Sequence, residues 1–109
     1  MMSEQAPKPG WHRSIQERHP GFIEAVEELG AAVRKAGPLD DKVAHLVQLS
    51  AAAALRSEGA VHSHARRALE SGATPDEVRH AIILVTSTIG FPNVAAALSW
   101  VDDLIAKRH

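Results

Sequence analysis

The spacing of apolar residues along the chain predicts helices from about residue 21 onward. Between residues 22 and 36, apolar side chains recur every three or four positions, as they do on one face of an α-helix. The residues of that stripe are Phe22, Ile23, Val26, Leu29 and Val33. Comparable patterns over residues 41–57, 60–71, 75–89 and 91–107 predict four more helices. Since no strand pair or hairpin turn stands out, we expect an all-α fold of about five helices.

Residues that start and stop helices support this division of the chain. Thr74 is followed by a proline and, at the third position, by Glu77, which is the pattern of a capping box. An aspartate at residues 40–41 fits the N-cap of the second predicted helix. Gly72 fits the position just after a helix end. We expect Gly59 to interrupt the helical pattern with a bend or a short break.

The polar N-terminal segment differs in composition from the rest of the chain. Residues 1–20 contain several prolines and no long apolar run, so we expect an arm that is disordered or packed on a neighbour. Residues 21–109 are then a single helical domain. The longest apolar stretch, residues 51–55, is too short to cross a bilayer, and no secretory signal is visible. We therefore expect a cytoplasmic protein with no membrane partner.

Charge and cysteine content exclude several classes of function. Twelve basic and thirteen acidic residues give a formal charge of −1, which argues against a dedicated nucleic-acid binder. The chain contains no cysteine, so a disulfide, a thiolate metal site and a cysteine nucleophile are all excluded. It does contain seven histidines.

Candidate chemistry gathers near the start of the third predicted helix. Glu58 and His62 are four residues apart and pair if the helix continues through Gly59. His62 and His64 are two apart, so on one helix they point about 200° apart. His45 lies on the preceding helix, and it approaches this region if the two helices form a hairpin.

Three interpretations of this cluster stay open. Neutral imidazoles with a carboxylate suit zinc or iron, although the pattern is not HExxH and no sequence rule fixes a third ligand. Histidine with a carboxylate partner also suits general acid–base chemistry. In the third interpretation the histidines, Glu58 and the arginines at 66 and 67 form a hydrogen-bonded network at a helix or subunit interface.

The order and spacing of several segments point to a known family. The segments are Leu39-Asp40-Asp41-Lys42 before an alanine-rich helix, His64 with Gly72 eight residues later, Thr74-Pro75-Asp76-Glu77-Val78, and Gly90-Phe91-Pro92 followed by Ala95-Ala96-Ala97. With these segments, residues 39–104 resemble the carboxymuconolactone decarboxylase family, whose other branch is the alkylhydroperoxidase-D-like proteins. The resemblance implies an all-α, alkylhydroperoxidase-D-like domain that assembles into homotrimers or homohexamers.

The resemblance also bears on the reaction. The peroxidase branch uses two cysteines and a glutamate, and the matching positions here hold Ser57, Ala60 and His45. The thiol peroxidase mechanism is therefore excluded. The decarboxylase branch keeps the histidine that matches His64, which implies cofactor-free acid–base chemistry on a small carboxylate or lactone.

Under that resemblance, each polar residue of the cluster has an expected role. His64 is the acid–base residue, with His45, Glu58 and His62 as its candidate partners. The arginines at 66 and 67 are candidates for binding a substrate carboxylate, and no metal or cofactor is expected. The alternatives are a non-catalytic oligomeric binding or structural protein and a histidine-based metal-binding module.

Overall fold

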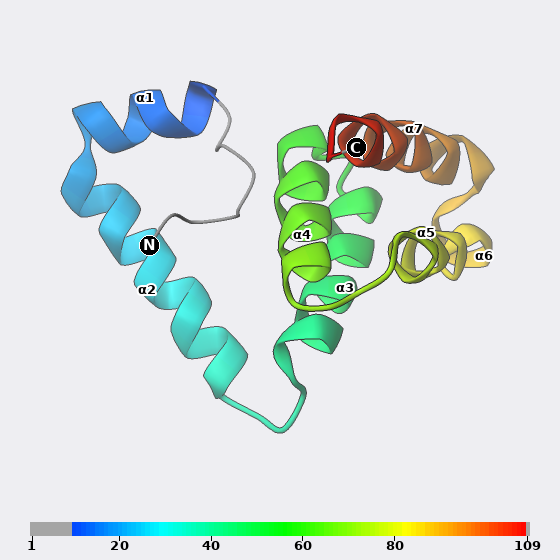
Figure 1. The fold of residues 1–109 in the computed structure, drawn as a ribbon, viewed down its shortest axis with the longest axis horizontal. Coiled ribbons are helices and arrows are strands. Elements are labelled where there is room, and N and C mark those ends of the chain that lie inside the picture. Colours follow the sequence, from blue (N-terminus) through cyan, green and yellow to red (C-terminus); the bar gives the residue numbers. More distant parts are fainter. Residues whose placement is uncertain (1–9, 109) are drawn as a thin grey trace. The chain divides into compact units, whose positions relative to one another are not determined.

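The chain is all-helical in the part that the structure describes. The structure is a computed structural model that describes residues 10–108, without the side chains of residues 11 and 108. The helices of this part, which contains no strand, are α1 (Gly10–Arg18), α2 (Pro20–Lys35), α3 (Asp41–Ala54), α4 (Glu58–Glu70), α5 (Pro75–Ile83), α6 (Thr86–Ile89) and α7 (Phe91–Arg108) (Figure 1). The predicted fold class is confirmed. None of these helices is both long and apolar enough to span a membrane.

The chain divides into two compact units, the first ending at Leu39 and the second beginning at Asp40. In the first unit, residues 10–18 form helix α1, within the segment for which the sequence predicts a polar arm. The backbone N–H of His19 donates to the Ile15 carbonyl at 2.7 Å, so the α1 hydrogen bonding continues to the edge of α2. Ile23 of α2 is buried. The expected arm also covers residues 1–9, which lie outside the described residues.

The core of the second unit is centred on the packing of α3 against α4. Leu49 and Val61 are fully buried there. The residues beside them are small, because the buried surfaces of α3 and α4 also carry Ala52, Ala53, Ala65 and Ala68. Such short side chains let two helix backbones approach closely. Val78 and Ile82 of α5 and Val94 and Val101 of α7 also belong to this core cluster.

A three-residue turn joins α3 to α4. Arg56 adopts a positive φ of 54°, and the backbone N–H groups of Arg56 and Ser57 donate to the carbonyls of Ala53 and Ala52, both at 3.1 Å. This Schellman motif ends α3. The Ser57 hydroxyl then accepts from the Ala60 N–H and caps α4. The predicted break at Gly59 is wrong, because this cap starts the helix at Glu58 and leaves the glycine inside the first turn.

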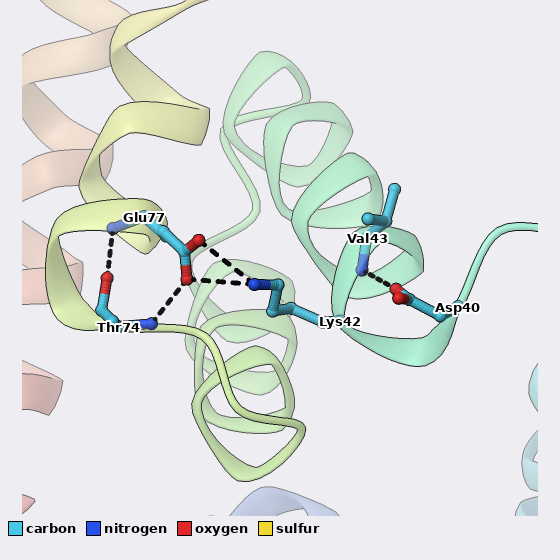
Figure 2. A network of polar contacts seen from close by, with 5 residues as sticks. All are labelled: Asp40, Lys42, Val43, Thr74 and Glu77. Atoms are coloured by element: carbon cyan, nitrogen blue, oxygen red, sulfur yellow. Dashed lines mark hydrogen bonds and ion pairs between the residues drawn. The ribbon is translucent and has the colours of Figure 1, made fainter.

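The connection from α4 to α5 follows the sequence prediction. Gly72 has a φ of 103°, and the Ala73 N–H donates to the Ala68 carbonyl at 2.9 Å, which closes α4 with a second Schellman motif. At the start of α5, the Thr74 hydroxyl accepts from the Glu77 N–H at 3.0 Å, and Glu77 Oε1 accepts from the Thr74 N–H at 2.9 Å (Figure 2). The capping box is confirmed.

The long helix predicted to end at Ile89 is divided in the structure. Regular α-helix stops at Ile83, and the short helix α6 resumes at Thr86. The Thr86 hydroxyl donates to the Ile83 carbonyl at 2.7 Å, which satisfies one of the carbonyls at the end of α5. The segment is also rich in β-branched residues, which lower helix propensity. Together these explain the division.

Two polar contacts join α5 to α3. Lys42 Nζ of α3 lies 3.1 Å from Glu77 Oε2 of α5 (Figure 2). The Ser50 hydroxyl of α3 donates to the Ala81 carbonyl of α5 at 2.7 Å. The Thr74 backbone N–H, with Lys42 as the second cause, holds the pKa of Glu77 below its ordinary value of 4.5. Glu77 therefore both caps α5 and ties it to α3.

We predict that Gly72→Ala destabilises the protein by about 1 to 2 kcal/mol, because an alanine is strained at this positive φ. A methyl group there meets no other atom within 4 Å, so the loss is one of backbone conformation and not of packing. Urea unfolding followed by circular dichroism measures it. Gly21→Ala, at an open helical position, is the control and should be neutral or stabilising. Equal effects of the two substitutions would contradict the prediction.

The lowered pKa of Glu77 predicts a pH-dependent contribution to stability. Since the folded-state pKa lies below the ordinary value of 4.5, the contribution is complete above that value and is lost as the pH falls through the folded-state pKa. Wild type should therefore be more stable than Glu77→Gln at neutral pH, with a difference that shrinks in acid. Lys42→Met should keep part of this dependence, because the Thr74 N–H remains. If the free energies of unfolding of wild type and Glu77→Gln changed with pH in parallel, the Glu77 carboxylate would have no pH-dependent role in stability.

Candidate functional site

His45 is held inside the second unit by α3. The Asp40 carboxylate accepts from the Val43 N–H at 2.9 Å and fixes the start of that helix (Figure 2). The side chain of His45 is only 4% exposed. A histidine this deeply buried needs a polar partner, because an unpaired imidazole loses its hydrogen bonds to water without replacement.

The partner across the hairpin is His64 of α4. The Nδ1 atoms of the two rings are 3.4 Å apart, the ring centroids are 5.6 Å apart, and the ring planes are inclined by 35°. His64 is only partly buried, so it is the more exposed member of this histidine pair. The expectation that a hairpin brings His45 toward the His62–His64 region is thus confirmed for His64.

The contact between the two Nδ1 atoms restricts how protons are arranged in the histidine pair. A hydrogen bond between them needs a proton on one Nδ1 and a lone pair on the other. If His64 donates, its Nδ1–H is fixed and its Nε2 is left to gain or lose a proton. His45 is then held with its own proton on Nε2. The pair can therefore orient one imidazole while the other exchanges protons.

Glu58 and His62 are not brought into the histidine pair. Glu58 is exposed at the first position of α4, about 9 Å along the helix axis from His64. His62 projects from α4 about 200° away from His64. Its Nε2 is buried without a hydrogen-bond partner among the described residues, so Glu58 does not pair with that atom.

The two arginines of α4 occupy different surroundings. Arg66 is buried, and its Nη1 lies 3.5 Å from Oε2 of Glu70, one turn later. Arg67 is partly buried and lies three residues after His64, which places it on the same side of α4. Of the two candidates for binding an anion, Arg67 is therefore the one beside the histidine pair.

Sequence reasoning missed Gln48. Its Oε1 is buried and has no hydrogen-bond partner within the described part of the chain. Gln48 follows His45 by three positions, so it lies one turn away on the same side of α3. That spacing was the available signal. A buried amide oxygen without a partner can accept a hydrogen bond from a bound molecule.

An apolar groove of about 290 Å³ lies between α3 and α5. Its lining residues are Val43, Leu46, Val47, Ser50, Glu77, His80, Ala81 and Leu84. By helical spacing, the α3 residues of this set face away from His45. The groove is therefore separate from the histidine pair, and the sequence patterns did not predict it.

The side chains of the described residues form no group of three or more histidines, aspartates and glutamates that could hold a metal ion. The chemistry that the site residues offer by themselves is thus that of two imidazoles, with an amide oxygen and a guanidinium nearby on the same helices. This is a set suited to moving protons and holding an anion.

Comparisons with known proteins bear on the family. Residues 20–103 match the sequence model of the carboxymuconolactone decarboxylase family. An uncharacterized protein of Methanocaldococcus jannaschii is 32% identical over 84 residues, which are 77% of this chain and 78% of the relative. No solved structure matches the chain. The family match begins at α2, earlier than the resemblance seen in the sequence, and it covers most of the described helices. The chain belongs to the carboxymuconolactone decarboxylase family.

Proposed function

We propose that this protein catalyses cofactor-free acid–base chemistry on a small carboxylate-bearing lactone, with His64 as the catalytic residue and His45 as its positioning residue. The observation that carries the proposal is the contact of 3.4 Å between their Nδ1 atoms. Family membership supports the substrate class, since the family is named for the decarboxylation of such a lactone.

The difference in burial between the two histidines supports these two roles. His45 is almost fully buried, so it is poorly placed to meet a substrate. His64 is more exposed, and its ring is oriented through Nδ1. With Nδ1–H of His64 donating to His45, the same hydrogen bond persists whether Nε2 of His64 is protonated or not. One imidazole can therefore serve as acid and then as base without rearranging its support.

In the proposed decarboxylation, loss of carbon dioxide is matched by the transfer of one proton from His64. The bond between the ring carbon and the carboxylate breaks, carbon dioxide leaves, and the electron pair stays on carbon, delocalised into the lactone carbonyl. Nε2–H of His64 donates its proton to that carbon. A proton from water then restores His64. No oxidant, reductant or cofactor takes part in these steps.

Two other side chains suit the binding of such a substrate. Arg67, one turn from His64, can hold a carboxylate by charge-assisted hydrogen bonds. Gln48, one turn from His45, offers a buried acceptor for a substrate hydroxyl or enol proton. Both lie on the two helices that carry the histidine pair, so the packing of that hairpin sets the distances between all four groups.

The first prediction from this proposal concerns His64. Wild type should convert carboxymuconolactone and release carbon dioxide, and His64→Ala should lower kcat/KM by about 100-fold or more, because positioned acid–base groups contribute at least that much. His80→Ala, in the separate groove, is the matched control and should keep wild-type activity. A wild type that converts no carboxymuconolactone, or a folded His64→Ala that keeps full activity, would overturn the proposal.

The second prediction separates positioning by His45 from a purely structural role. His45→Gln can still accept from Nδ1–H of His64, whereas His45→Leu cannot. We expect His45→Leu to lower kcat about fivefold, the loss of one hydrogen bond of about 1 kcal/mol, and His45→Gln to recover most of that loss. Nitrogen-15 NMR of the imidazoles should show His64 protonated on Nδ1 in wild type and in His45→Gln. Equal activities for both variants would leave His45 with no positioning role.

A further inference from the structure

The two rings of the histidine pair face each other through the same ring atom. The Nδ1 atoms of His45 and His64 are 3.4 Å apart and the ring centroids are 5.6 Å apart, so each Nδ1 lies on the side of its ring that is turned toward the other ring. This distance is long for a hydrogen bond. It matches the separation of two nitrogen ligands of one tetrahedral zinc ion, which is about 3.3 Å for zinc–nitrogen bonds of about 2.0 Å.

A third polar atom suits the same ion. Gln48 follows His45 by three positions, so the two side chains lie one turn apart on the same side of α3, a spacing at which helical residues share a metal. The buried Oε1 of Gln48 has no hydrogen-bond partner in the described part of residues 10–108. Such an oxygen has lost its interactions with water without replacement, and coordination to a cation restores what was lost. Amide oxygens of this kind ligate cations in proteins.

We propose that His45, His64 and Gln48 bind one zinc ion, through Nδ1 of both histidines and Oε1 of the glutamine. Only two of these ligands are histidines, and the third is an amide, so the site differs from the groups of three histidines, aspartates or glutamates that the described side chains do not form. Three protein ligands leave the fourth tetrahedral position for water or a small anion. Arg67, on the same side of α4 as His64, carries a positive charge that favours an anion there.

The fold sets the spacing of the ligands before an ion binds. Both histidines lie on helices that are packed through small buried alanines, so the core of the second unit, and not a loop, determines the distance between the two Nδ1 atoms. Ligands that are already gathered lose little conformational entropy on binding. Imidazole binds a metal in its neutral form, so zinc requires only that each ring carry its proton on Nε2.

Zinc at this site opposes the acid–base role of His64. This consequence rests on the proposed function, whereas the zinc site itself does not. Zinc occupies the Nδ1 lone pairs of both rings, so the hydrogen bond between the rings is lost and Nε2 of His64 keeps its proton. Giving up that proton would leave an imidazolate anion, so His64 no longer serves as an acid and then as a base. Zinc is therefore an inhibitor of the proposed reaction and not its cofactor.

The first test measures zinc binding to the untagged full chain by isothermal titration calorimetry. Wild type should bind one zinc ion per chain, and a folded His64→Ala should bind it at least about tenfold more weakly. His80→Ala, which removes an exposed histidine of α5, is the control and should bind zinc as wild type does. Nitrogen-15 NMR of wild type should show zinc shifting the Nδ1 signals of His45 and His64 alone. A wild type without zinc binding, or shifts at other histidines only, would overturn the proposal.

The second test concerns the third ligand. Gln48→Leu removes the amide oxygen and should weaken zinc binding by about tenfold or more. Gln48→Glu replaces it by a carboxylate, which attracts a cation more strongly, and should tighten zinc binding by about tenfold. A gain of affinity from one substitution and a loss from the other are not expected of a residue that only supports the fold. If Gln48→Glu bound zinc no more tightly than Gln48→Leu, the three-ligand site would be wrong.

Activity measurements separate this site from the proposed reaction. If wild type decarboxylates carboxymuconolactone, saturating zinc should abolish that activity, and magnesium, which prefers oxygen ligands, should not. Full activity with zinc bound would overturn the inhibitory role. A wild type that binds zinc through the histidine pair but converts no lactone would refute the proposed reaction and support the zinc site. A wild type that converts the lactone but binds no zinc would do the reverse.

Discussion

The close packing of α3 against α4 is the constraint on which the second unit depends. Alanines at 52, 53 and 65 let the two helices approach, and Leu49 and Val61 are fully buried between them and their neighbours. The same approach brings the ring centroids of His45 and His64 to 5.6 Å from each other. A bulkier residue at one of these alanine positions would separate the helices and break the Nδ1 contact before it changed any residue of the site itself.

Local signals in the sequence were enough to locate much of the fold. The capping box at Thr74 and the left-handed Gly72 depend on neighbouring residues alone, so their patterns could be recognised without the rest of the chain. The break expected at Gly59 was wrong because the Ser57 cap, only two residues earlier, determines where the helix begins. Helix α1 was not predicted because it is short and polar, with no apolar stripe to identify it.

The candidate site was predictable only in part, since it depends on contacts between helices. The sequence indicated that His62 and His64 face different directions, and a hairpin made His45 a candidate partner. It could not show that His64 rather than His62 meets His45, because that depends on how far each helix is rotated about its axis. The sequence also did not show which side chains are buried. Arg66 is buried and forms an ion pair with Glu70, whereas Arg67 is only partly buried.

The two histidines of the pair also lie close together in the sequence, which affects how easily the chain brings them into contact. His45 and His64 are nineteen positions apart, and nearly all of the intervening chain is helix, closed by one tight turn. The entropy lost on closing so short a connection is small compared with that for groups drawn from distant elements. The meeting of the two imidazoles is therefore a local event in the chain, while α5 and α7 supply the rest of the core that keeps the hairpin packed.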